Sequence, residues 1–281
     1  MANFRSLAIA LMVGFALLTG GIPTGSEART LAPQDDPQLE SKIGDYLSGL
    51  DASYGIAAVN LNDGRSAFVN ADTGFPTASM YKLLVMYRVF QAVDGGSLSM
   101  DDQVTIQDAD LAQLDSTDLS VGDTMTVAGA LGNMITVSSN ASAWAITRLL
   151  GGWGQVTSAA EELGMSSTYL DGQDFWSTPG DMTHFFRLLA ERSLVSDAAS
   201  GQMIDLLLQQ ADNDRIPALL PDGVQVAHKT GELDGVRNDG GIIRGPSGNY
   251  VIVVMSQSGD TSEQVQAEAE ISRMVYAHYG E

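Results

Sequence analysis

Strand-like segments stand at both ends of the chain, and a long stretch with helical periodicity separates them. Runs rich in β-branched and aromatic residues cover positions 54–61, 66–70, 224–230, 240–244 and 250–257. The first two runs flank Asn62-Asp63-Gly64, which marks a β-hairpin because these residues tolerate a positive φ. Since strands bury their apolar faces in a sheet, we expect the two ends of the chain to complete one sheet together.

Two helices are expected to flank this sheet. The first runs from Pro37 to about Leu50, and the last, from Ser262 to Tyr279, places its apolar residues largely on one face. We therefore predict an α/β (α+β) fold with an antiparallel five-stranded sheet, flanked by N- and C-terminal helices, and an inserted, mostly helical subdomain. The α/β part covers about 39–72 plus 221–281, and the helical part covers about 73–220.

The first residues have the features of an export signal. Arg5 precedes an apolar stretch, and Ser26-Glu27-Ala28 has the small-x-small pattern of a signal-peptidase site. The apolar stretch has only twelve residues, from Leu7 to Leu18, whereas about 20 are needed to span a bilayer. We expect a signal peptide over 1–28, cleavage near Ala28, a secreted or periplasmic protein without a membrane anchor, and a flexible lead-in over 29–38.

The chain is strongly acidic, with a formal net charge of −21 at pH 7. Nucleic acid is therefore an unsuitable partner, and we interpret the acidity as a hydrated shell that supports solubility. The absence of cysteine excludes disulfides, thiol nucleophiles and thiolate metal sites. The histidines at 184, 228 and 278 are too scattered to form a metal-ligand set, so no metal or cofactor is expected.

A serine and a lysine stand three residues apart where a helical pattern begins. Ser79 and Lys82 follow Pro76, and the pattern continues to Val93, where Asp94-Gly95-Gly96 stops it. Their side chains therefore project from one helical face. A helix N-terminus and burial both lower the proton affinity of an amine, which lets Lys82 act as a base towards the Ser79 hydroxyl. Alone, this pair is weak evidence, and an ordinary helix start is the alternative interpretation.

Two further motifs follow in the sequence. Ser138, Ser139 and Asn140 lie between two helical segments, where they form a capping turn or aim side chains into a cleft. Lys229-Thr230-Gly231 ends a strand-like run. Only three lysines occur in the chain, and two of them lie in these motifs, which a solubility argument does not explain. An edge-strand lysine is the alternative interpretation of Lys229.

In this order, the motifs resemble the S-x-x-K, S-D-N and K-T-G set of class A β-lactamases and related penicillin-binding serine hydrolases. The resemblance covers nearly the whole mature chain, including the segment from Gly95 to Val104 and the last strands. It implies a β-lactamase-like transpeptidase fold for 39–281 and an acyl-enzyme mechanism. It also implies a small-molecule β-lactam or a peptidoglycan stem peptide as substrate, and a monomer.

The resemblance also assigns roles to individual residues. Ser79 would be the acylated nucleophile and Lys82 its base or proton relay. Ser138, assisted by Lys229, would carry a proton to the leaving nitrogen. The remaining positions would bind substrate, Gly231 among them. Asn140 would bind its amide side chain, Thr230, Lys229 and Arg237 its carboxylate, and the N–H groups of Ser79 and Glu232 its oxyanion. Arg244 is an alternative to Arg237.

Three positions depart from the family pattern. Class A enzymes hydrolyse the acyl-enzyme with a glutamate on a long loop, but here Thr178-Pro179 ends a short loop. Asp174 stands at the place of the glutamate, either as a shorter deacylation base or as a turn aspartate. Ser139 replaces the family's aspartate, and Glu232 brings a negative charge beside the expected carboxylate site. These departures keep three functions open: a β-lactamase, a D-Ala-D-Ala carboxypeptidase or penicillin-binding protein, and a penicillin sensor without turnover.

Overall fold

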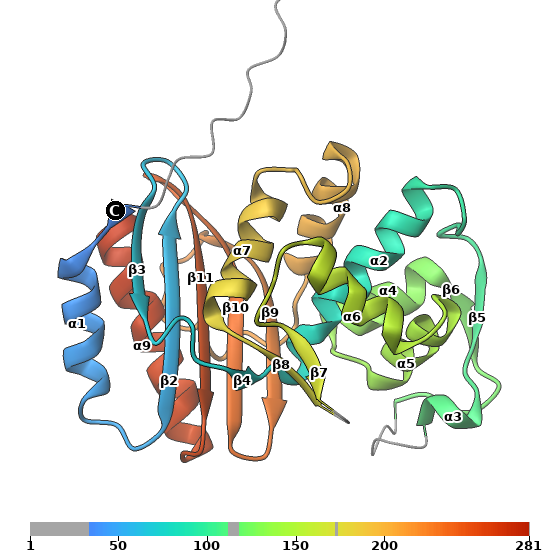
Figure 1. The fold of residues 1–281 in the computed structure, drawn as a ribbon, viewed down its shortest axis with the longest axis horizontal. Coiled ribbons are helices and arrows are strands. Elements are labelled where there is room, and N and C mark those ends of the chain that lie inside the picture. The colour runs from blue at the N-terminus through green and yellow to red at the C-terminus, as the bar shows by residue number, and fades with distance from the viewer. Residues whose placement is uncertain (1–33, 112–117, 172–173, 281) are drawn as a thin grey trace, which may run out of the picture. The chain divides into compact units, whose positions relative to one another are not determined.

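The computed structural model describes residues 34–111, 118–171 and 174–280, and for residues 170, 171 and 174 it describes the backbone only. The expected signal peptide and the start of the lead-in lie outside these residues. A sheet with the strand order β1-β3-β2-β11-β10-β9 forms the central layer (Figure 1). Its strands are β1 Gln34–Asp35, β2 Ser53–Asn60, β3 Arg65–Val69, β9 Gln225–Leu233, β10 Val236–Gly245 and β11 Gly248–Gln257.

The predicted fold class is confirmed, and the five long strands pair antiparallel. The sixth strand is the addition: β1 pairs parallel with β3, with Gln34 opposite Arg65. The lead-in expected over 29–38 therefore ends earlier than predicted, because Gln34 and Asp35 are held by the sheet edge. Helix α1, Pro37–Leu47, begins two residues later, with Asp36 as its cap.

The sheet separates two apolar cores, and strand β11 shows how. Ile252 and Val254 pack with α1 and with α9, Thr261–Tyr279. Val251, Val253 and Met255 face the opposite side, where α7, Pro179–Ala190, covers the sheet. A strand that is buried on both faces reads as a continuous apolar run rather than an alternating one, which is what residues 250–255 show.

The helical part packs around α2, Lys82–Asp94, which a single 3-10 turn, η1 Ala78–Tyr81, precedes. Nine consecutive residues of α2, from Lys82 to Phe90, are buried, because other helices surround it (Figure 1). The other helices are α3 Asp108–Leu111, α4 Val127–Thr136, α5 Asn140–Leu149, α6 Trp153–Glu162 and α8 Asp197–Leu207. In the part of the chain that is described, no helix combines the length and apolarity required to cross a bilayer.

Short strands within the helical part were not predicted. They are β4 Phe75–Pro76, β5 Gln103–Thr105, β6 Thr124–Thr126, β7 Tyr169–Asp171 and β8 Asp174–Ser177. Segments of two to four residues are too short to show a period of two in the sequence. One of them matters for the site, since β4 lies directly before the turn that carries Ser79 and pairs with β8.

Candidate active site

The segment that carries Ser79 is fixed on both sides. The Asn238 side-chain amide donates to the Pro76 carbonyl (2.8 Å) and the Thr77 carbonyl (3.1 Å). Gly231 of β9 passes so close that a Cβ there would lie 2.6 Å from the Thr77 carbonyl oxygen, so only glycine fits. Ala78 has a φ of +47°, a left-handed conformation that costs free energy in a non-glycine residue. These contacts hold the nucleophile turn against β9.

The Lys82 amine lies at the centre of the site, with no exposed surface. Its Nζ is 3.0 Å from Ser79 Oγ and 3.1 Å from Ser138 Oγ. Two shorter contacts are to acceptors only, the Ser138 carbonyl at 2.6 Å and Asn140 Oδ1 at 2.7 Å. A neutral amine has two N–H donors and one lone pair, so these two acceptors use its donors and leave the lone pair for a hydroxyl proton.

Burial lowers the pKa of Lys82 well below its ordinary value, and the nearby charge of Lys229 lowers it further. The causes are desolvation of an ammonium and repulsion between two like charges. A lysine in this environment holds its proton weakly, and the hydrogen-bond pattern suits the neutral form of the amine. It can therefore accept a proton from Ser79.

The turn before α5 serves the site and the helix at once. Ser139 caps α5 by accepting a hydrogen bond from the Ser142 N–H at 3.2 Å. Ser138, with a φ of +58°, and Asn140 both line the pocket instead. The capping turn and the side chains aimed into a cleft, the two interpretations of this motif, therefore both occur, at neighbouring residues.

Lys229 supplies a second buried amine on β9. Its Nζ donates to Ser138 Oγ at 3.1 Å and to the Thr230 carbonyl at 2.8 Å. Burial lowers the pKa of Lys229 to about 8, while the charge of Asp239 opposes this shift. Lys229 therefore carries its positive charge at neutral pH. Ser138 Oγ lies between the two amines and connects them.

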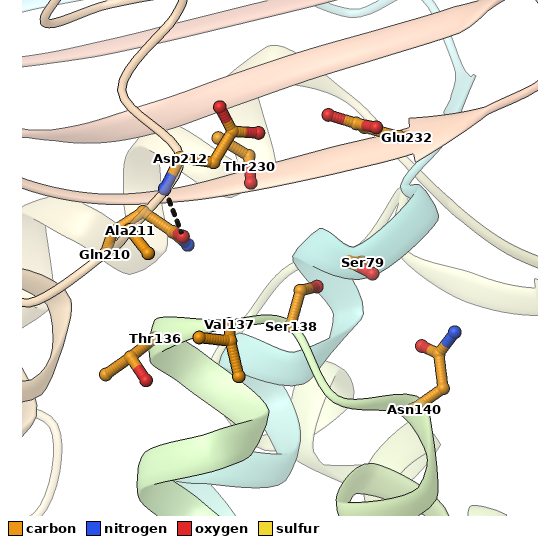
Figure 2. Close-up of a pocket in the computed structure, with 10 residues that line it drawn as sticks. All are labelled: Ser79, Thr136, Val137, Ser138, Asn140, Gln210, Ala211, Asp212, Thr230 and Glu232. Carbon is orange, nitrogen blue, oxygen red and sulfur yellow. Dashed lines mark hydrogen bonds between the residues drawn. The ribbon is translucent and has the colours of Figure 1, made fainter. Parts of the chain in front are cut away.

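These groups open into a pocket of about 520 Å³ between β9, η1 and the turn before α5 (Figure 2). Its lining includes Ser79, Ser138, Asn140, Thr230 and Glu232. Figure 2 shows the side chains of Ser138 and Asn140 below Ser79 and strand β9 above it. The structure thus brings together three motifs that lie far apart in the sequence.

An arginine that the sequence analysis did not identify lies behind this pocket. Arg215 is fully buried, and its Nη2 contacts Glu232 Oε1 and lies 3.1 Å from Asp212 Oδ2. Asp212 and Glu232 both line the pocket. Nothing in the sequence distinguishes this arginine, since it follows Asp212-Asn213-Asp214 in a break between helix and strand. Only its burial reveals it.

The two arginines proposed from the sequence lie elsewhere on β10. The Arg237 Nη1 donates to the carbonyls of Leu233 (2.9 Å) and Val236 (2.8 Å), at the turn between β9 and β10. Arg244 stands near the other end of β10, opposite Gln225 of β9. The guanidinium that contacts pocket-lining residues is therefore that of Arg215, and carboxylate binding by Arg237 or Arg244 stays a prediction.

Asp174 begins strand β8, where its backbone pairs with Asp171 of β7. Its side chain lies outside the described part of the structure, so its role as a base stays a prediction. The carbonyl of the next residue, Phe175, accepts a hydrogen bond from the Thr77 N–H at 2.7 Å. The Phe175 ring stacks on Tyr81, with centroids 5.1 Å apart. The short loop is thus a hairpin that presents an aromatic ring to the nucleophile turn.

The three histidines have separate partners. His184 lies near the Leu163 carbonyl, His228 near Asp239 and His278 near Asp36. Within the described ranges, no group of three or more His, Asp and Glu side chains is arranged to hold a metal ion.

Known proteins resemble this chain along most of its length. A profile of the "Beta-lactamase enzyme family" matches residues 38–279. A β-lactamase from Bacteroides uniformis is 27% identical over 281 residues, which is 89% of this chain and 94% of the relative. The structure of a β-lactamase from Sphaerobacter thermophilus has a TM-score of 0.81 at 26% identity and covers 87% of this chain and 98% of that one. The structure of PBP-A has a TM-score of 0.84 at 24% identity and covers 88% and 98%.

The family profile therefore covers the five long strands of the sheet, the helical part and every residue of the site. The fold is that of the class A β-lactamases, and the protein is a β-lactamase-like serine hydrolase. The chain belongs to the beta-lactamase enzyme family.

Proposed function

We propose that the protein is a class A-like β-lactamase that is acylated at Ser79 and hydrolyses the β-lactam amide bond. The observation that carries the proposal is the chain of contacts from Ser79 Oγ through Lys82 Nζ and Ser138 Oγ to Lys229 Nζ. This chain joins a nucleophile, a base whose pKa is lowered and a positive charge in one pocket.

In the acylation step, Ser79 Oγ attacks the lactam carbonyl carbon and loses its proton to Lys82 Nζ. The carbon–nitrogen bond breaks, and Ser138 Oγ donates a proton to the leaving nitrogen. Ser138 regains a proton from one of the two amines that it contacts. The N–H groups of Ser79 and Glu232 stabilise the negative charge on the carbonyl oxygen, an effect of about 3 to 4 kcal/mol in comparable sites.

Water completes the reaction by attacking the ester carbonyl, which releases the opened lactam and restores the serine hydroxyl. We assign the base for this step to Asp174, because it begins the strand that pairs with β4 beside Ser79. We further propose that the protein works outside the cytoplasm as a monomer after removal of residues 1–28. The apolar N-terminal stretch, which is too short for a membrane span, supports export.

A D-Ala-D-Ala carboxypeptidase or other penicillin-binding protein is the second candidate, and the hairpin favours it. Phe175 and Trp153 pack against Tyr81, so aromatic rings stand on the side of the nucleophile turn where the hairpin lies. Such rings give a hydrolytic water few polar partners, which would prolong the acyl-enzyme. One neighbour with the same fold, 24% identical, is a mutant of PBP-A described as an acyl-enzyme complex with penicillin G.

One experiment separates the candidates. The purified mature protein is mixed with a chromogenic cephalosporin, and both hydrolysis and protein mass are followed. We expect many turnovers and only a transient adduct on Ser79. A persistent adduct supports the carboxypeptidase or the sensor without turnover. If neither hydrolysis nor adduct appears, acylation at Ser79 is wrong.

A further inference from the structure

We propose that Glu232 competes with the carboxylate of the substrate for Arg215 and thereby determines which substrates the pocket accepts. Its carboxylate contacts Arg215 at the wall of the pocket that also holds Ser79 and Thr230. The inference rests on the proposed function, in which a substrate carboxylate approaches Thr230 and Lys229 while Ser79 is acylated.

Arg215 is held from behind and stays in place when its pocket-side partner leaves. Its Nη1 donates to the Asn238 carbonyl at 3.3 Å, and its Nε lies 3.1 Å from Asp214 Oδ1. Burial acts to lower the pKa of Arg215, but the nearby acidic groups, including the fully buried Glu268 of α9 and Asp239 of β10, outweigh burial and raise it. A guanidinium so enclosed cannot turn into solvent, so its Nη2 stays beside Asp212 and Glu232, which line the pocket.

Glu232 is the exchangeable partner. Its side chain retains 49% exposure, whereas that of Arg215 has none. It is therefore the one that can swing into water at little cost. Asp212 also remains beside Nη2, with 37% exposure.

The charges explain why this exchange affects specificity. One guanidinium faces three carboxylates, from Asp212, Asp214 and Glu232. An incoming carboxylate meets no free cation at Arg215 and is repelled by these groups until Glu232 withdraws. A substrate without a carboxylate has no such requirement. Glu232 therefore weakens acylation by anionic substrates and leaves neutral ones unaffected.

The test uses benzylpenicillin and its methyl ester, which differ only in this carboxylate. The second-order rate constant for acylation of Ser79 is measured for each compound by mass spectrometry, and their ratio, acid over ester, is compared among variants. We expect Glu232→Ala to raise this ratio about tenfold over the wild type. Glu232→Gln keeps the shape without the charge and should give an intermediate ratio. The matched control is Glu161→Gln, an exposed glutamate on α6 outside the pocket, which should leave the ratio unchanged.

An unchanged ratio in Glu232→Ala overturns the inference, even if both rate constants rise together. Should Glu232→Ala fail to fold, the ratio in Glu232→Gln decides by the same criterion. Failure of the proposed function looks different, since then neither compound labels the folded wild-type protein. That result overturns the inference together with its premise.

Discussion

The cluster around Lys82 and the β7–β8 hairpin both lie next to the turn that carries Ser79 but differ in construction. In the cluster, Ser79, Lys82, Ser138 and Lys229 are joined by hydrogen bonds between polar groups, and both amines are buried. The hairpin instead places the Phe175 ring against Tyr81. The comparison teaches that formation and hydrolysis of an acyl-enzyme depend on different parts of the site, so one chain can be well equipped for the first step and less so for the second.

The strongest test of the cluster removes its nucleophile. Ser79→Ala should reduce cephalosporin hydrolysis by about 10⁴-fold or more, because no other group can form the ester. Intact-protein mass spectrometry should show no adduct. Residual adduct formation in Ser79→Ala would place the nucleophile on another residue.

Removal of the base should have the next largest effect. Lys82→Ala should slow acylation by about 100- to 10,000-fold, measured by stopped-flow absorbance with the cephalosporin. Lys82→Arg is the control that retains charge, and it should be equally slow because a guanidinium does not deprotonate at these pH values. Rapid acylation in either variant would contradict the role of Lys82 as base.

The hairpin is tested by Asp174→Asn. If Asp174 is the deacylation base, the lifetime of the acyl-enzyme should rise by about 10- to 100-fold while the acylation rate stays the same. The lifetime is read from the decay of the adduct mass after a short pulse of substrate. Equal lifetimes would remove Asp174 from the mechanism and leave the hairpin without a base among the candidates.

The pH dependence gives the smallest effect and again concerns the cluster alone. The pKa of Lys229 is lowered to about 8, so the amine is charged below this pH and loses its charge above it. Second-order acylation by benzylpenicillin should therefore fall about tenfold between pH 7 and pH 9, as the protonated fraction falls. In Lys229→Arg the side chain stays protonated, so the acylation rate constant should not fall between pH 7 and pH 9. The same pH profile in both proteins would contradict the role of the Lys229 charge.

Much of the fold could be predicted because its signals are local. The hairpin at Asn62-Asp63-Gly64, the last strands and the closing helix each show their own periodicity or turn residues. The position of Ser79 next to Lys82 follows from helical spacing alone.

Other features depend on contacts that no local pattern shows. The burial of Arg215 arises from residues of β9, β10 and the loop before β9, so the sequence around it reads as an ordinary polar break. Likewise, the pairing of Phe75 with Ser177 involves strands too short to have a period. The sequence identified Glu232 as unusual, but only the structure shows that its partner is Arg215.

The order of strands in the sheet also has a consequence for the life of the chain before it is complete. Tyr250 of β11 pairs with Asn60 of β2. The β2–β3 hairpin is therefore synthesised long before the strand that pairs with it. Until then β2 has an open edge, which is a site where unfinished chains can stick to each other. The excess of acidic over basic residues, 35 to 14 in the full sequence, makes such encounters repulsive and offers a purpose for the acidity. Because Lys229 lies on β9, the pocket too is completed only by residues near the end of the chain.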